Sequence, residues 1–234
     1  MPSTLRSSVV ANVLGRLHAQ ADDEDSLAAQ RVRARETEIG HRLAQEQRYE
    51  LYGEAPLSIT PEVGQLLHLL ALSTKPRRIV EFGSSLGVST IYLAAAIRDC
   101  GGGTLITSER HTQKAELALQ NLADAGLGDL VDLRSGDALH TLANIAEPID
   151  LVFLDGCNDL YLPTLRLLEP RLSPSGLVVA DLSADDPDLL PYLEYVREPA
   201  CGYFSMTVPL DDGVELSVRE GTDGRDRSPA AVLR

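Results

Sequence analysis

From residue 61 onward, short runs of apolar residues alternate with longer segments in which apolar residues recur at helical spacing. This pattern predicts strands over residues 78–82, 104–108, 131–134, 151–154 and 177–180. It predicts helices over residues 61–73, 88–98, 112–125, 138–145, 160–172 and 188–196. Such alternation is typical of βαβ units, so we expect an α/β fold with a Rossmann-like, doubly wound and mostly parallel sheet. Segments 203–209 and 213–219 are expected to close it as an antiparallel hairpin.

The first fifty residues follow a different pattern and are rich in Ala, Arg, Gln and Glu. The apolar residues of the first stretch recur at helical spacing: Val9, Val13, Leu14 and Leu17. A second stretch covers residues 25–43, so we expect two amphipathic helices with a break at residues 22–24. These helices either cover a ligand site on the sheet or pack against a second subunit. The pattern leaves both roles open.

The change of pattern divides the chain into three parts. We expect residues 1–56 to form a helical cap or dimerisation segment and residues 57–220 to form the ligand-binding domain. Residues 221–234 are polar and are expected to form a flexible tail. At 234 residues, the chain is long enough for one domain with such additions.

The net charge and the cysteine content limit the kinds of partner and the compartment that we expect. The formal net charge of −14 at pH 7 repels nucleic-acid backbones and anionic membrane surfaces, so a small-molecule substrate fits better. The three cysteines, Cys100, Cys157 and Cys201, contain no CxxC pair, which favours free thiols in a reducing compartment. The sequence has no cationic-then-apolar leader and no apolar run of about twenty residues. We therefore expect a cytoplasmic protein.

The loop after the first predicted strand carries the first chemical signal. Gly83-Ser84-Ser85-Leu86-Gly87 leads from a strand into a helix, where glycine permits positive φ and free N–H groups can bind an anion. A dinucleotide site needs G-x-G-x-x-G, whose second glycine is Ser85 here, although Arg110 beside Glu109 keeps an NADP site open. The segment also matches the G-x-S-x-G nucleophile of hydrolases. That fold needs a late histidine, and none follows His140.

Acidic residues at successive strand ends favour a third interpretation, an S-adenosylmethionine site. Glu81 precedes the glycine turn and would face the methionyl part of the cofactor, whose carboxylate Ser89 and the turn amides would hold. Glu109 ends the second strand, where a carboxylate can accept both ribose hydroxyls. Asp137 follows the third strand at the position of the adenine edge, and Asp155 follows the fourth. Four such residues in register are unexpected from helix capping alone.

Together these motifs resemble the class I O-methyltransferases of the catechol and caffeoyl-CoA type, also called family 3. The likeness runs from about residue 57 to residue 219 and rests on segments 58–65, 79–90, 136–138, 150–156, Tyr161 and 177–181. It implies a seven-stranded sheet, S-adenosylmethionine as cofactor, a small phenolic or catechol-like methyl acceptor, and a homodimer. The residues that it implies as cofactor contacts are Ile59, Glu81, Gly83, Ser84, Ser89, Glu109, Ala138 and Asp155.

The chain departs from this family at two positions that bear on chemistry. Family members usually bind a divalent cation through one Asp after the fourth strand and an Asp-Asn pair after the fifth; here these are Asp155, Asp181 and Leu182. The usual lysine is Asn158, which cannot act as a base. Two carboxylates and water could still hold Mg²⁺. Alternatively, Asp155 and Asp181 serve the cofactor amine and helix capping.

A phenolic acceptor also needs help to ionise, because its pKa is about 10. The candidate bases are Asp155 and Asp181, and His111 or His140 if the fold brings one close. We expect Tyr161 to line the acceptor pocket or to pack rather than to react. We expect turnover to persist in excess EDTA. Since two family positions have changed, a catalytically silent cofactor-binding or regulatory protein stays open as an alternative.

Overall fold

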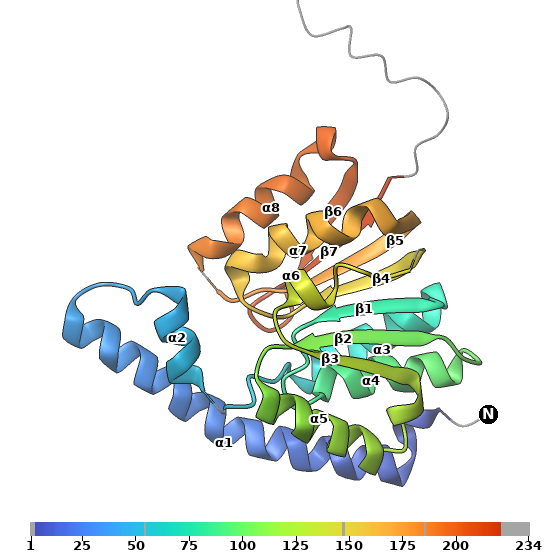
Figure 1. Cartoon of the computed structure of the whole chain (residues 1–234), viewed down its shortest axis with the longest axis horizontal. Helices are drawn as coiled ribbons and strands as arrows, with labels where there is room; N and C mark the ends of the chain where they lie inside the picture. Colours follow the sequence, from blue (N-terminus) through green and yellow to red (C-terminus); the bar gives the residue numbers. More distant parts are fainter. Residues whose placement is uncertain (1–2, 54, 147, 185, 221–234) are drawn as a thin grey trace, which may run out of the picture.

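The computed structural model describes residues 3–53, 55–146, 148–184 and 186–220. Its seven-stranded sheet has the order β3-β2-β1-β4-β5-β7-β6 (Figure 1). The strands are β1 (Arg78–Phe82), β2 (Thr104–Glu109), β3 (Val131–Ser135), β4 (Ile149–Leu154), β5 (Leu172–Asp181), β6 (Tyr203–Val208) and β7 (Val214–Arg219). The first five pair in parallel, whereas β7 is antiparallel to both β5 and β6. The expected sheet and its C-terminal hairpin are confirmed.

Helices cover both faces of this sheet, as Figure 1 shows. They are α1 (Ser8–Ile39), α2 (Gln45–Tyr52), α3 (Pro61–Thr74), α4 (Val88–Asp99), α5 (Thr112–Asp124), α6 (Ala138–Thr141), α7 (Tyr161–Leu168) and α8 (Leu190–Arg197). Short 3₁₀ turns occupy Thr4–Arg6, Gly128–Leu130, Asn158–Leu160, Glu169–Arg171, Pro187–Leu189 and Pro199–Cys201. None of the described helices combines the length and the apolar character needed to cross a membrane.

The alternation of side chains along each strand creates two cores. In β1, Ile79 packs in the core formed with α1, α3, α4 and α5, while Val80 packs in the core formed with α6, α7 and α8. In β5, Val179 packs in the first of these cores and Val178 packs in the second. Both faces of the central strands are therefore buried, which explains why these strands read as continuous apolar runs in the sequence.

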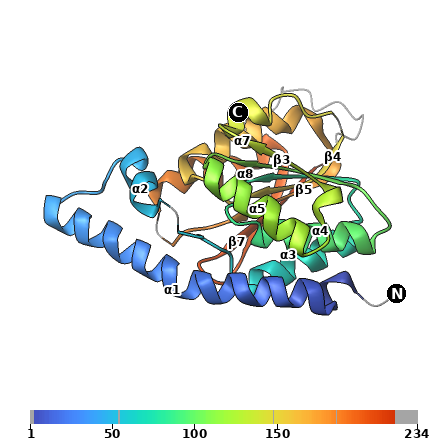
Figure 2. The ribbon, with the colours of Figure 1, turned by 60° about the horizontal axis from the view of Figure 1, so that its bottom comes forward.

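The expected break at residues 22–24 is wrong. Helix α1 runs without interruption from Ser8 to Ile39, from an N-cap at Ser7 to a left-handed C-cap at Gly40. The acidic run contains neither proline nor glycine, so it adds charge to the helix without breaking it. At the start of the helix the buried face also differs from the predicted one by one position. Val10 is buried, whereas the predicted Val9 is 52% exposed. Figure 2 shows the second half of α1 projecting beyond the sheet, with α2 folded back from its end.

Several other boundaries differ from prediction. Helix α6 ends at Thr141 instead of residue 145, and the Arg134 guanidinium donates to the Thr141 carbonyl at 2.7 Å. Leu142 and Ile145 are buried without helical structure, so their apolar pattern misled the prediction. Helix α7 ends at Leu168 before the turn that contains Pro170, and β5 already begins at Leu172. The predicted tail, residues 221–234, lies outside the described residues.

Candidate functional site

A cavity of about 430 Å³ lies at the carboxyl ends of the parallel strands. Its walls come from the loops after β1, β2, β3, β4 and β5, from the β6–β7 turn, and from α1 and α2. Ligands of open α/β sheets bind at this edge, and the volume suits a small organic ligand. Carboxylates outnumber cationic side chains on its surface, which favours a ligand with positive charge.

The glycine turn brings two walls of the cavity together. Gly83 has a φ of +93°, and a Cβ atom there would lie 2.3 Å from the carbonyl oxygen of Asp155. Gly87 is also left-handed and directly precedes α4. Glycine is therefore required at Gly83 for both its conformation and its close approach to the next strand end. Ser85 also has positive φ, and its hydroxyl donates to the carbonyl oxygen of Pro56.

Glu109 joins the end of β2 to this turn. One of its carboxylate oxygens accepts from the Ser85 amide and the other from the His111 amide, each at 2.8 Å. The side chain is buried and borders the cavity. Each carboxylate oxygen has a second lone pair, so Glu109 can still accept hydrogen bonds from a ligand. The two amides hold it in one orientation.

Ile59, Asp137 and Ala138 also border the cavity. Asp137 caps α6 by accepting from the Leu139 amide at 2.8 Å, and Ala138 begins that helix. Ile59 follows a segment that α1 holds in place: the Asp25 carboxylate accepts from the backbone amides of residues 57 and 58 at 2.6 and 3.0 Å. Helix α1 thus positions one wall of the cavity.

Three of the predicted cofactor contacts, Glu81, Ser84 and Ser89, are buried and do not border the cavity. Glu81 shares the face of β1 that packs on α4, where the Thr90 hydroxyl donates to its carboxylate at 2.6 Å. Burial raises the pKa of Glu81. Its neighbour Phe82 borders the cavity instead, as strand alternation requires.

Asp155 and Asp181 lie side by side at the ends of β4 and β5, because Leu154 pairs with Ala180 in parallel register. Burial, followed by the charge of Asp181, raises the pKa of Asp155 well above its usual range. Burial and the nearby carboxylates of the β6–β7 turn raise the pKa of Asp181 to about 7. The pair can therefore hold a proton near neutral pH, where an exposed aspartate is ionised.

The donor set here does not fit the family's divalent cation. Leu182 offers a hydrocarbon side chain where the family has an asparagine. Among the described residues, no group of three or more His, Cys, Asp or Glu side chains could hold a metal ion. Asn158 is directed elsewhere, since its amide donates to Asp186 at 3.0 Å. We therefore derive no chemistry through a metal.

The two histidines suggested as bases do not border the cavity. His111 caps α5 and its ring stacks on Tyr49 of α2 with centroids 4.5 Å apart. His140 lies within α6. Tyr161 does border the cavity, and its hydroxyl donates to the carbonyl oxygen of Asp181 at 2.8 Å. Burial raises the pKa of Tyr161 well above its usual value.

Residues of both N-terminal helices border the cavity within the same chain. Asp25 and Ala29 of α1 border it, as do Arg48, Tyr49 and Tyr52 of α2. No sequence motif marks these residues, because each lies in a polar helical pattern that is typical of a solvated surface. Lys114 of α5 was missed for the same reason, whereas the two aspartates of the β6–β7 turn read as ordinary turn residues.

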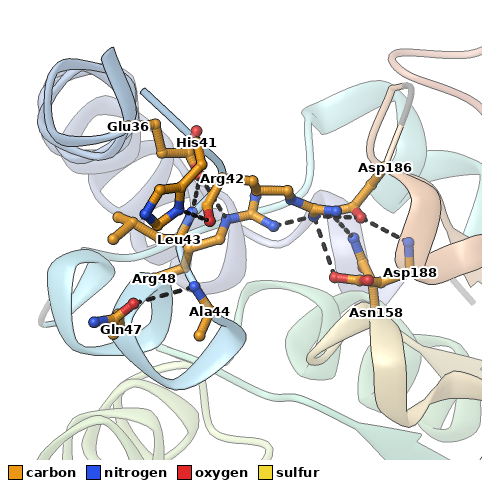
Figure 3. Close-up of polar contacts among 10 residues, drawn as sticks. All are labelled: Glu36, His41, Arg42, Leu43, Ala44, Gln47, Arg48, Asn158, Asp186 and Asp188. Carbon is orange, nitrogen blue, oxygen red and sulfur yellow. Dashed lines mark hydrogen bonds and ion pairs between the residues drawn. The ribbon is translucent and has the colours of Figure 1, made fainter. Parts of the chain in front are cut away.

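An ion-pair cluster fastens these helices to the far wall (Figure 3). We call it the Asp186 cluster; its members are Arg42, Arg48, Asn158, Asp186 and Asp188. Arg42 and Arg48 pair with the Asp186 carboxylate at 2.5 and 3.2 Å, and Arg42 also pairs with Asp188 at 3.2 Å. Burial opposes the charge of Asp186, but the Asp188 amide, Arg42, Asn158 and Arg48 together lower its pKa to about 2. The cluster joins the corner between α1 and α2 to the loops after β4 and β5.

Known proteins are similar to this chain in sequence and in fold. The family model described as a methyltransferase domain matches residues 80–181. A catechol O-methyltransferase of Niastella koreensis is 33% identical over 152 residues, which cover 63% of this chain and 67% of that protein. Catechol O-methyltransferase B of Danio rerio is 32% identical over 178 residues, or 70% of this chain and 66% of that protein.

A solved structure agrees with these relatives. The O-methyltransferase TomG of Streptomyces achromogenes, solved in complex with SAM, superposes with a TM-score of 0.64 and 26% identity. The match covers 85% of this chain and 90% of that one. The sheet order, the glycine turn and the sequence likeness agree, and the chain belongs to the S-adenosylmethionine-dependent O-methyltransferases.

Proposed function

We propose that the protein transfers the methyl group of S-adenosylmethionine to a hydroxyl oxygen of a small phenolic or catechol-like acceptor. The observation that carries the proposal is one cavity in which the Gly83 turn, Glu109 and Asp155 meet at the carboxyl edge of the sheet. S-adenosylmethionine has a net positive charge, which suits a cavity rich in carboxylates. The relatives named catechol O-methyltransferases support the acceptor class.

In this proposal, different residues contact different parts of the cofactor. Glu109 accepts the ribose hydroxyls, while Asp137 and Ala138 border the adenine and Ile59 borders the methionyl part. When bound, S-adenosylmethionine supplies a methyl group on a positively charged sulfur. The chain's main task is then to align the acceptor oxygen with that methyl group and to exclude water, and such alignment lowers a barrier by roughly 7–11 kcal/mol. The cover formed by α1 and α2 serves the exclusion of water.

Asp155 and Asp181 are our candidates to accept the proton of the acceptor. A phenol has a pKa of about 10, far above that of an ordinary aspartate. With its pKa raised to about 7, Asp181 is a better matched base by about three units, or about 4 kcal/mol at about 1.36 kcal/mol per unit. The Tyr161 hydroxyl fixes the backbone of Asp181 and so helps to position it.

We propose further that turnover needs no divalent cation, because Leu182 and Asn158 replace a ligand and a lysine of the family. Methyl transfer in excess EDTA should match transfer in Mg²⁺. Complete loss of turnover in EDTA, restored by Mg²⁺, would contradict this part. Binding of S-adenosylmethionine without transfer to any acceptor in a panel of phenols, catechols, amines and carboxylates would favour the catalytically silent alternative.

Glu109→Ala tests the cofactor assignment. Loss of a charge-assisted hydrogen bond should weaken the affinity for S-adenosylmethionine about tenfold or more, as measured by titration calorimetry. Glu109→Gln keeps the shape and one acceptor oxygen, and we expect a smaller loss. If the wild-type protein binds neither S-adenosylmethionine nor S-adenosylhomocysteine, the proposed function is wrong.

Assembly and location are parts of the same proposal. We propose a homodimer in which β6 and β7 contribute to the interface, because Phe204, Met206 and Val218 leave an apolar surface exposed there. Sedimentation at micromolar concentration would test it, with Phe204→Ser as the disrupting variant. We propose a cytoplasmic location: in the part of the chain that the structure describes, the three cysteines form no disulfide. Residues 1–56 act mainly as the cover of the cavity.

A further inference from the structure

A buried lysine of helix α5, Lys114, lies at the wall of the cavity. Lys114 occupies the first turn of α5, five positions after Glu109, and is 6% exposed. It borders the cavity. No hydrogen bond or ion pair joins its ammonium group to any residue that the structure describes. Its three N–H donors are therefore available to a ligand.

Two carboxylates lie near this ammonium group and offset its charge without hydrogen bonding to it. They are Glu109 and Asp25, with Cys157 as the third titratable neighbour. Both oxygens of each carboxylate already accept backbone amides, from residues 85 and 111 for Glu109 and from residues 57 and 58 for Asp25. Burial lowers the pKa of Lys114, while Glu109 and Asp25 act in the opposite direction. The lysine thus lies near two carboxylates whose orientation is set by backbone amides.

A purely structural role does not explain this lysine. Buried lysines are almost always paired, and burying most of the Lys114 side chain without a hydrogen bond from its ammonium group to a described residue has a free-energy cost. The apolar buried residues of α5 include Ala115, Ala118 and Leu122, and Leu122 packs in the core between the helix and the sheet. A methionine at position 114 would fill the same volume without that cost. The position of Lys114 beside Glu109 suggests a ligand that both residues contact.

We propose that Lys114 is a specificity-determining residue of the cofactor site. Its ammonium group donates a hydrogen bond to a ribose hydroxyl oxygen, and the same hydroxyl group donates its own hydrogen to Glu109. This inference rests on the proposed function. A vicinal diol presents donors and acceptors together, so a carboxylate and an ammonium group side by side complement both. The charge of Asp25 favours the ammonium form of Lys114, and helix α1 thereby contributes to the cofactor site.

Titration calorimetry with S-adenosylhomocysteine and its 2′-deoxy and 3′-deoxy analogues tests the contact. Lys114→Met should weaken the affinity for S-adenosylhomocysteine about tenfold or more. With the analogue that lacks the contacted hydroxyl, the same substitution should change affinity less than about threefold. Gln113→Met, on the exposed side of the same turn, is the matched control and should leave all three affinities unchanged.

A second readout separates binding from folding. Lys114→Met leaves the carboxylates of Glu109 and Asp25 without the nearby positive charge, so the ligand-free variant should melt at a lower temperature than the wild type. Lys114→Arg keeps the charge and N–H donors, so it should retain the melting temperature and most of the affinity for S-adenosylhomocysteine. Equal affinity of wild type and Lys114→Met for S-adenosylhomocysteine would overturn the inference and leave the proposed function intact. So would a change confined to the KM of the acceptor. Absence of S-adenosylhomocysteine binding by the wild type would overturn both.

Discussion

The carboxylates on the two sides of the cavity differ in the hydrogen bonds that they accept. On the side formed by β1, β2 and β3, Glu109 accepts two backbone amides and Asp137 accepts one. On the side formed by β4, β5 and the β6–β7 turn, no described residue donates a hydrogen bond to the side chain of Asp155 or Asp181. Oriented anions suit the recognition of one fixed ligand, whereas adjacent carboxylates with raised pKa values suit the exchange of a proton. The cavity thus combines a rigid side with a titratable side.

Gly83→Ala should have the largest effect, because it tests the rigidity of the first side. The added Cβ would lie 2.3 Å from the Asp155 carbonyl oxygen, at a φ that disfavours alanine. Backbone strain and overpacking together should reduce the free energy of unfolding by about 4 kcal/mol in urea denaturation. Gly40→Ala is the matched control, since Gly40 is left-handed with open space around it and should lose about 1 kcal/mol. Equal losses would mean that the turn adapts.

Asp181→Asn tests the titratable side through pH. A carboxyl group with a raised folded-state pKa lowers stability as pH rises from the unfolded value of about 4 to the folded value of about 7. The variant should therefore be more stable than the wild type at pH 8, by about 2 kcal/mol, and equal to it near pH 4. A pKa difference of about three units sets an upper limit of about 4 kcal/mol on this stability difference. We expect about half of that limit, because Asp155 shares the proton with Asp181. A difference that does not depend on pH would contradict this account of the pair.

Asp186→Asn should have the smallest effect, confined to the cover. The pKa of Asp186 is about 2, so its ion pairs persist at neutral pH and are lost as pH falls from about 4 through 2. Partly exposed pairs contribute about 1 kcal/mol, so hydrogen exchange of the α2 amides should accelerate about fivefold, and salt should weaken their protection in the wild type. Asp129→Asn removes the exposed pair with Arg98, far from α2, and should leave these amides unchanged. Slower exchange, or no change, in Asp186→Asn would show that the cluster does not hold the cover.

The sequence alone determined the sheet and its strand ends. Strand β1 begins and ends at the predicted residues, and Glu109, Asp137 and Asp155 lie at the cavity as the βαβ pattern implies. These features are predictable because apolar periodicity and turn glycines act over a few residues, and because parallel strands all present their carboxyl ends at one edge. The same local logic, applied to strand alternation, explains why Glu81 packs on α4 rather than in the cavity.

Tertiary structure decided what distant segments do to one another. The burial of Lys114 near Glu109 and Asp25 and the Asp186 cluster leave no local signature. Arg42 and Asp186 are 144 positions apart, and each reads in the sequence as an ordinary exposed charge. Burial and charge pairing depend on which side chains meet once the chain is folded, so the roles of these residues followed from the three-dimensional arrangement.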